Sequence, residues 1–346
     1  MTGGVVGRNL RIDFLKLLCA QCIVLHHFSV YGPVGDALAA AAPAVSAWLY
    51  DYGRMAVQVF LVLGGYLAVG SLERMRATGS QTLVAVVWKR YLRLVLPLLA
   101  ALLLVTLVAA LTRLGLQDDF IPDAPSLSQV LSHVLLLQDV LGIEALSVGV
   151  WYVAIDFQLY VLMAFLVWGG QALAAVPHAT RVLVGALMLL SLFHANRNPD
   201  WDAWAVYFFG AYGMGAVARW AQRSPHRALM LAGLVAVVAL ALVMEFRERL
   251  VLALVTALVL GTMPRTARVW PAGLQRWVAL LGQSSYALFL VHFSVLMLVN
   301  LVFAQWRLAG PWATGLALLA GVALSTGLAV VFARRVETPL SRWADR

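Results

Sequence analysis

Charge is the property that this sequence has least of. Only 12% of its 346 residues are charged and 62% are apolar, whereas a soluble domain is about 25% charged and about 45–50% apolar. A soluble protein cannot hide so much apolar surface, and a chain with so little charge is not intrinsically disordered. The long apolar runs lack strict alternation of polar and apolar residues, which indicates membrane-spanning helices rather than barrel strands.

Cysteine is also scarce. The two cysteines, Cys19 and Cys22, stand in the first apolar run. A C-x-x-C pair can be redox-active or bind a metal, but the sequence has no second pair to complete a zinc site. We therefore expect both thiols to pack as small apolar groups, and we expect no metal site and no permanently bound cofactor.

Acidic residues are outnumbered, 16 against 25 Lys and Arg, which leaves a net charge of +9. In a soluble chain this excess suggests nucleic acid, but beside membrane spans it indicates cytoplasmic loops that follow the positive-inside rule. With a cytoplasmic N-terminus, most basic residues fall on inner segments and most acidic residues on outer ones. We expect an all-α, polytopic membrane helix bundle of about ten transmembrane helices, with both termini cytoplasmic and no nucleic-acid partner.

The expected spans follow from apolar runs of about twenty residues. Residues 126–147 are amphipathic and are expected outside the bilayer or at its surface. No repeat or linker divides the sequence, so we expect one membrane domain over residues 1–346. The expected spans cover residues 14–33, 52–72, 92–112, 149–170, 181–195, 204–220, 228–244, 249–264, 279–304 and 312–333.

Polar residues inside these spans are few, and an intramembrane ionisable residue is a functional candidate. His27, Gln58, Asp156 and His292 lie at a similar depth in four different spans. A histidine and a carboxylate at one level can act as base and orienter. The alternative is a set of unrelated hydrogen bonds between helices. The polar residues of the spans are Lys16, His26, His27, Gln58, Asp156, Gln158 and His292.

Lys16 and His27 share one face of the first span, whereas His26 points ~100° away from it. Lys16 and His27 are eleven residues apart, which is close to three whole turns of a helix. Asp13 lies one turn before Lys16 and can pair with it. The alternative is a lysine that extends its amine to the membrane surface and a histidine that makes an ordinary hydrogen bond.

A basic segment, residues 88–93, precedes the third span. Arg90 and Arg93 are three residues apart and therefore share a helix face. Two guanidinium groups can bind phosphates in bidentate fashion, and coenzyme A is a candidate ligand. Flanking positive charge that contacts lipid headgroups is the alternative.

Five segments carry sequence patterns that occur in a fixed order. Residues 13–27 resemble D-x-x-(R/K)-x10-H, residues 59–66 resemble F-F-V-x-S-G-(F/Y), residues 89–97 resemble R-R-x-x-R-x-x-P, residues 151–160 resemble W-x-L-x-x-E-x-x-F-Y, and residues 285–292 resemble S-Y-x-x-Y-L-x-H, with Glu337 and Pro339 near the end. Together they resemble the acyltransferase 3 family of integral-membrane acyltransferases.

Four departures from this family's usual residues bear on the chemistry. Lys16 stands where many members have Arg, and Gln58 stands where many have Asp. Asp156 replaces Glu, and Gly64 replaces Ser. A lysine is a point charge rather than a planar fork, and Gln58 removes a carboxylate. The departures indicate a divergent subgroup and leave the acceptor open.

The resemblance implies ten spans and transfer of an acyl group, often acetyl, from cytoplasmic acyl-CoA to a hydroxyl of a cell-envelope or exported saccharide. It implies that His27 is catalytic. We expect His27 to act as a general base, assisted by Asp156 and Lys16. Arg90, Arg93 and Lys89 are the expected donor-binding residues. Gln58 or Tyr160 is the expected oxyanion donor. The remaining expected polar pocket residues are Trp151, Gln158, Ser285, Tyr286 and His292.

The expected partners are acyl-CoA, a saccharide or lipid-linked glycan, and the lipids of a bacterial inner membrane. Acetyl-CoA is the first candidate for the acyl-CoA. Two other functions stay open. A transporter or flippase of a lipid-linked saccharide would use buried Lys, Asp and His for proton coupling. A non-catalytic module that binds an acyl group would tolerate the loss of His27.

Overall fold

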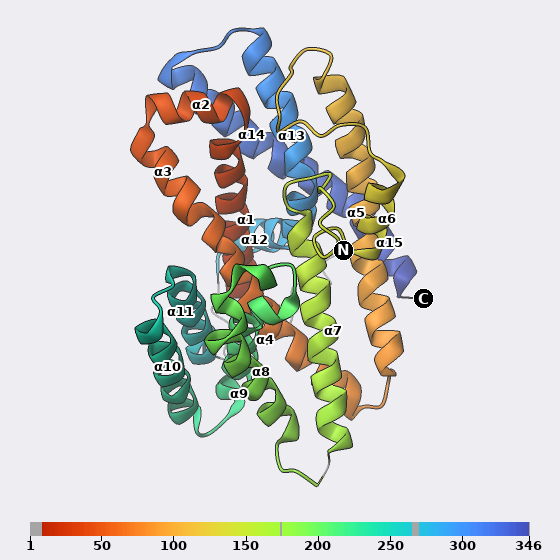
Figure 1. The fold of residues 1–346 in the computed structure, drawn as a ribbon, viewed down its shortest axis with the longest axis vertical. Coiled ribbons are helices and arrows are strands. Elements are labelled where there is room, and N and C mark those ends of the chain that lie inside the picture. Colours follow the sequence, from red (N-terminus) through yellow and green to blue (C-terminus); the bar gives the residue numbers. More distant parts are fainter. Residues whose placement is uncertain (1–8, 174, 265–269, 346) are drawn as a thin grey trace. The chain divides into compact units, whose positions relative to one another are not determined.

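The fold consists of helices joined by turns and by longer irregular segments such as residues 113–126 and 136–149 (Figure 1). A computed structural model describes residues 9–173, 175–264 and 270–345, and within these ranges it contains no strand, which confirms the all-α class. The helices are α1 (Leu10–Val30), α2 (Gly32–Ala41), α3 (Pro43–Tyr52), η1 (Gly53–Met55), α4 (Ala56–Ala77), α5 (Leu83–Thr112), α6 (Leu127–Leu135), α7 (Val150–Ala172), α8 (Ala179–Phe193), η2 (Ala195–Arg197), η3 (Pro199–Trp201), α9 (Ala205–Arg223), α10 (Arg227–Met244), α11 (Glu248–Thr262), α12 (Ala272–Gln283), α13 (Ser285–Gln305), α14 (Gly310–Phe332), the π-helical turn η4 (Ala333–Glu337) and α15 (Thr338–Ala344).

Eight helical segments of the described chain are long and apolar enough to cross a membrane. They match eight of the ten expected spans, and the protein is a polytopic helical membrane protein. The segments are Leu10–Val30, Pro43–Ala77, Leu83–Thr112, Val150–Ala172, Ala179–Arg197, Arg227–Met244, Ser285–Gln305 and Gly310–Ala344.

The other two expected spans, residues 204–220 and 249–264, also form helices, α9 and α11, but they are not among the eight. α11 has only 15 residues. α9 contacts α8, α10 and α11, and most of its residues are buried. A helix that is enclosed by other helices does not need the long apolar surface that lipid requires.

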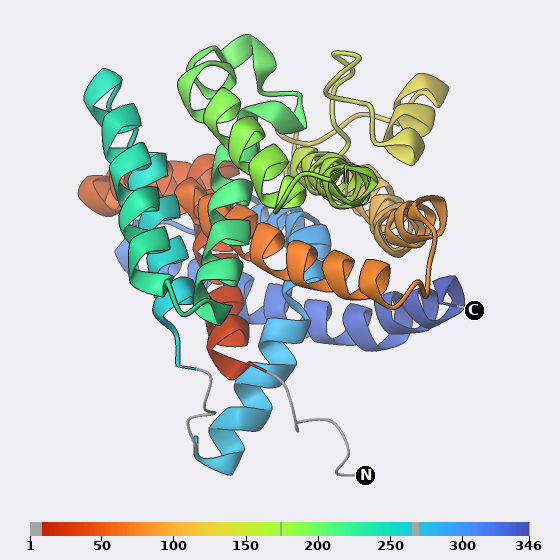
Figure 2. The same cartoon turned by 90° about the horizontal axis from the view of Figure 1, so that it is seen from below.

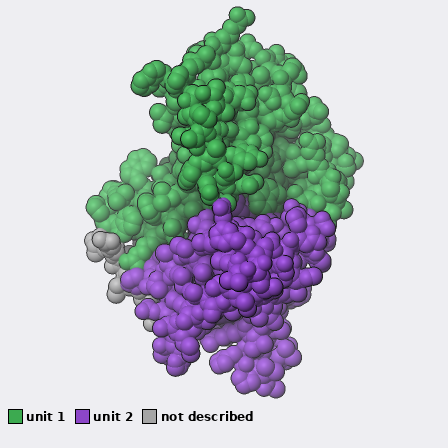
Figure 3. All heavy atoms as spheres, turned by 60° about the vertical axis from the view of Figure 1, so that its left-hand side comes forward, with its two compact units in different colours: residues 1–56, 92–151, 267–346 green, residues 57–91, 152–266 purple. Residues whose placement is uncertain are grey.

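The chain divides into two compact units, which Figure 3 colours separately. Unit 1 holds the described parts of residues 1–56, 92–151 and 267–346, and unit 2 holds residues 57–91 and the described parts of 152–266. The single domain expected over residues 1–346 stays a prediction, and its ends, residues 1–8 and 346, lie outside the described residues.

In unit 1, α1 contacts α2, α3, α12, α13 and α14, and Figure 2 shows α12 beside the beginning of α1. The chain turns directly after α1, at Gly32, whose φ of +74° favours glycine. Asn300 of α13 accepts the Val34 N–H at 2.8 Å and donates to the Tyr31 carbonyl at 3.4 Å. The end of α1 is therefore held against α13.

In unit 2, α9 and the part of α4 after Ala56 approach each other at glycines. A Cβ atom at Gly65 would collide with the Tyr212 carbonyl, and one at Gly215 would collide with the Val62 carbonyl. Small residues let membrane helices pack backbone to backbone. This close packing buries Tyr212, which is only 1% exposed.

Residues 126–147 form the short helix α6 and a series of turns, and they are not among the candidate spans. Ser126 and Gln129 make a capping box at the start of α6. Ser132 and His133 are buried, whereas Leu127 is exposed. The buried imidazole of His133 bonds the Gln129 carbonyl through Nδ1 at 2.6 Å, and its Nε2 accepts the Leu146 N–H at 3.2 Å. The position of this segment relative to the bilayer stays a prediction.

Candidate active site

Two histidines meet in unit 1. His27 of α1 and His292 of α13 are 265 residues apart in sequence, and the distance from His27 Nδ1 to His292 Nε2 is 2.7 Å. His27 is 9% exposed and His292 is fully buried. The ring planes differ by only 9° and the ring centroids are 4.9 Å apart. Face-to-face rings cannot bring two nitrogens to hydrogen-bond distance, so the rings lie edge to edge in an N–H···N hydrogen bond.

An aromatic ring lies near each member of this histidine pair. The Tyr31 ring is 6.0 Å from the His27 ring, and the Phe289 ring is 6.3 Å from the His292 ring, measured between centroids. His292 Nδ1 is 3.0 Å from the Leu288 carbonyl in its own helix. In the described chain, no group of three or more His, Cys, Asp or Glu side chains is placed to hold a metal ion.

His26 has a different partner from its neighbour. Its Nδ1 lies 2.9 Å from the Leu49 carbonyl, at the end of α3. Gly53 packs against the same side chain, since a Cβ atom there would come 3.0 Å from the His26 Cβ. The Tyr50 ring is 6.3 Å from the His26 ring, and Arg54 stands 5.5 Å from the Tyr50 centroid. His26 therefore attaches α3 to α1.

A charged pair occupies unit 2. Arg90 of α5 donates to the carboxylate of Asp156 in α7, and its guanidinium stands 5.1 Å from the centroid of the Tyr160 ring. Asp156 is buried, and Tyr152 and Tyr212 interact electrostatically with it. Neither tyrosine is among the expected site residues, because tyrosine in an apolar helix is usually a packing residue.

The departure at Gly64 has a structural reason in this cluster. A Cβ atom at residue 64 would lie 2.9 Å from Cε2 of Tyr212 and 3.8 Å from Oδ1 of Asp156. A serine would therefore collide with the Tyr212 ring. Glycine at this position was the one sequence signal that could have pointed to Tyr212.

The second arginine of the expected donor site belongs to unit 1. Arg93 is exposed and forms an ion pair with Asp345, directly after α15. The guanidinium groups of Arg90 and Arg93 are thus both paired with carboxylates, and Lys89 lies one residue before Arg90 in α5, half-buried. Arginine forks that hold carboxylates have the geometry that also suits phosphates.

The expected partner of Lys16 was Asp13, one turn away. The structure also brings Lys16 into electrostatic contact with Glu337, at the end of the π-helical turn η4. Asp13 is buried beside Gly282, where a side chain would collide with it. Glu337 belongs to the motif near the end of the sequence, but its proximity to Lys16 was not predictable from that motif.

Several expected pocket residues bond the backbone instead of facing one another. Gln158 donates to the Ala203 carbonyl and accepts the Ala205 N–H, at 3.2 and 2.9 Å, so it organises the start of α9. Ser285 donates to the Gly282 carbonyl, and Tyr286 donates to the Leu94 carbonyl. Gln58 and Trp151 are half-buried.

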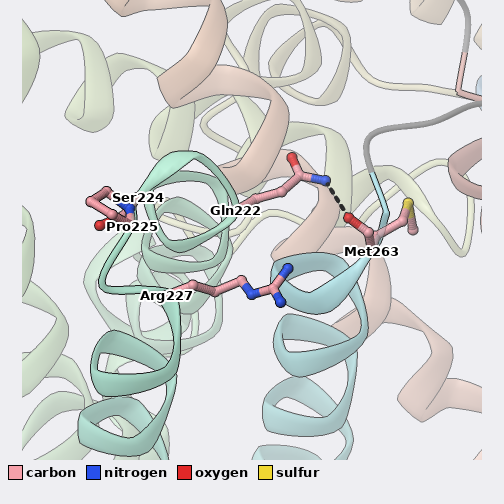
Figure 4. A pocket seen from close by; sticks show the side chains of 5 residues that line it. All are labelled: Gln222, Ser224, Pro225, Arg227 and Met263. Atoms are coloured by element: carbon pink, nitrogen blue, oxygen red, sulfur yellow. Dashed lines mark hydrogen bonds between the residues drawn. The ribbon is translucent and has the colours of Figure 1, made fainter.

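A separate pocket of about 370 Å³ lies in unit 2, lined by Gln222, Ser224, Pro225, Arg227 and Met263 (Figure 4). Gln222 donates to the Met263 carbonyl at 3.1 Å and accepts the Tyr66 hydroxyl at 2.5 Å. None of the expected site residues lines this pocket. It is therefore not the candidate active site.

The sequence model of the acyltransferase 3 family, described as an acyltransferase domain, matches residues 9–334. The chain belongs to this family. No curated protein and no solved structure matches it significantly. The match confirms the resemblance and contains both the histidine pair and the Arg90–Asp156 pair. This member of the acyltransferase 3 family is a membrane acyltransferase.

Proposed function

We propose that this acyltransferase moves an acyl group from cytoplasmic acyl-CoA to a hydroxyl of a saccharide or lipid-linked glycan. Acetyl is the first candidate for this acyl group. The observation that carries the proposal is His27, an imidazole enclosed in a helix bundle and bonded to a second imidazole at 2.7 Å. A buried histidine that bonds a fixed partner is suited to act as a general base.

One histidine is enough to take up and return the proton that this reaction moves. His27 takes the proton of the acceptor hydroxyl while the oxygen forms a bond to the thioester carbonyl carbon. The tetrahedral intermediate then collapses, the bond between carbon and sulfur breaks, and the departing thiolate takes the proton from His27. The products are an ester and free coenzyme A. A general base of this kind contributes roughly 10²–10⁴-fold to the rate.

Arg90 and Arg93, with Lys89, are the proposed ligands of the donor phosphates. Support comes from the ion pairs with Asp156 and Asp345, because each guanidinium already holds an anionic oxygen group. A phosphate of the donor would replace the exposed Asp345 carboxylate more readily than the buried Asp156 carboxylate.

A saccharide acceptor is supported by the aromatic side chains of α3. Trp48, Tyr50 and Tyr52 are exposed, and His26 attaches their helix to α1, next to His27. Exposed rings with a polar edge suit the faces of sugars, although they also suit the membrane interface. We place the protein in a bacterial inner membrane, where cytoplasmic acyl-CoA is available.

The test uses the full chain in nanodiscs of bacterial phospholipid. With acetyl-CoA and extracted envelope saccharides, the wild-type protein is expected to release free thiol and to add acetyl groups that mass spectrometry detects. His27→Ala is expected to lower the rate at least ~100-fold, because the base is lost. His26→Ala is the comparison variant, and it is expected to raise KM for the saccharide with kcat nearly unchanged, because its imidazole bonds the Leu49 carbonyl of α3 instead. Equal activity of His27→Ala and wild type contradicts the role of His27.

A further inference from the structure

We propose that His292 is a positioning residue that fixes the tautomer of His27, so that Nε2 of His27 is the atom that accepts the proton. The inference rests on the proposed function for its kinetic consequence, but the tautomer itself can be measured without any reaction. It concerns two side chains of unit 1, on α1 and α13.

The tautomers of both imidazoles follow from the hydrogen bond that His292 makes with one backbone carbonyl. A carbonyl only accepts hydrogen bonds, so Nδ1 of His292, 3.0 Å from the Leu288 carbonyl, carries a hydrogen. In a neutral imidazole the other nitrogen is then an acceptor. Nε2 of His292 therefore accepts the hydrogen bond from Nδ1 of His27. His27 in turn has its proton on Nδ1 and a lone pair on Nε2.

The pair is neutral before the reaction. Both rings are buried, and no carboxylate is within hydrogen-bond distance of either ring among the described residues. An unpaired charge in such surroundings is very unfavourable. The imidazole of His292 thus performs the orienting role that the sequence suggested for a carboxylate, without bringing a charge.

The same hydrogen bonds support the protonated state. When Nε2 of His27 takes a proton, Nδ1–H of His27 still donates to Nε2 of His292, and His292 still donates to Leu288. Hydrogen bonds in a chain polarise one another, so the new charge is spread over the chain. Only one proton moves, and it enters and leaves through the free nitrogen of His27.

The position of His292 is itself fixed. Asn300, two turns further along α13, bonds the backbone at Tyr31 and Val34, directly after α1. Tyr286, in the first turn of α13, donates to the Leu94 carbonyl at 2.9 Å. α13 is therefore attached on both sides of His292, which keeps the two imidazoles in register.

The kinetic test compares two nearly isosteric variants. In His292→Gln the amide oxygen can take the place of Nε2 and accept from His27, whereas His292→Met has no such acceptor. We expect His292→Met to lower kcat at least ~100-fold with KM for acetyl-CoA little changed, and His292→Gln to stay within ~10-fold of wild type. The double variant with His27→Ala is expected to be no slower than His27→Ala alone. Equal activity of the folded Met and Gln variants overturns the proposal.

The spectroscopic test does not depend on activity. Solid-state ¹⁵N NMR of the histidine-labelled chain, with His27→Ala and His292→Gln to assign signals, is expected to show both rings protonated at Nδ1 and bare at Nε2. A proton on Nε2 of His27 in the resting protein overturns the proposal. If wild-type protein shows this tautomer but transfers no acyl group, the proposed function fails while the positioning role stands.

Discussion

The histidine pair of unit 1 and the Arg90–Asp156 pair of unit 2 differ in the charge of their partners. The first joins two imidazole rings, which we propose to be neutral, with a single hydrogen bond, and the second joins two full charges beside the buried Tyr212. A neutral pair can gain a proton and lose it again, because neither partner depends on the charge of the other. A buried ion pair is fixed, since the removal of either partner leaves an uncompensated charge.

The largest expected effect on stability comes from breaking the ion pair. Arg90→Ala leaves the Asp156 carboxylate buried and is expected to lower the free energy of unfolding by about 3 kcal/mol. Asp156→Ala is expected to lower it less, because a third of the Arg90 side chain, 34%, reaches the surface. Thermal unfolding of both variants in detergent measures the difference. The double variant Arg90→Met with Asp156→Leu is expected to recover most of the loss, and no recovery contradicts this account.

A somewhat smaller effect is expected at the glycine beside this ion pair. Gly64→Ser is expected to lower the free energy of unfolding by about 1–3 kcal/mol, because its Cβ atom would lie 2.9 Å from the Tyr212 ring. The added Tyr212→Leu substitution removes the ring edge and should restore part of the stability. Gly169→Ser, where a Cβ atom meets no described atom within 4 Å, is the control. Equal losses at residues 64 and 169 speak against the steric explanation.

A third buried histidine, His133, lies outside the candidate spans. Burial lowers the pKa of His133, and its Nε2 accepts the Leu146 N–H, much as His292 accepts from His27. Because its pKa is lower in the folded than in the unfolded chain, its contribution is complete above about pH 6.5 and decreases as the pH falls further. We expect wild-type melting temperature to fall between pH 7.5 and 5.5 more than that of His133→Gln. Parallel pH profiles contradict this expectation.

The smallest expected effect is at the exposed ion pair. Arg93→Ala is expected to change the free energy of unfolding by less than about 1 kcal/mol, because both partners of the Arg93–Asp345 pair are solvated. The proposed donor site nevertheless predicts a higher KM for acetyl-CoA. Unfolding and KM measured on the same preparation separate the two roles. A loss of stability as large as that of Arg90→Ala would remove the distinction between the buried and the exposed pair.

The position of most functional candidates along the helices was predictable from the sequence. His27, Asp156 and His292 interrupt apolar runs, and such runs predict helices from local composition alone. Which helices pair, and which side chains meet between them, was harder to predict. Depth along a span can be counted in residues, but the direction that a side chain faces depends on the neighbouring helix. Gln158 shows this: an amide in a span was expected in a pocket, and it bonds the backbone at the start of α9.

The sequence by itself determined the membrane character of the protein, its helical class and its family, because these depend on composition and on motifs in a fixed order. Only the tertiary structure decided that His27 bonds His292, that Arg90 bonds Asp156 and that Tyr212 needs a glycine at residue 64. The partners of these contacts are separated by 265, 66 and 148 residues. Contacts at such separations depend on how helices rotate and pack, and no local pattern in the chain encodes that rotation.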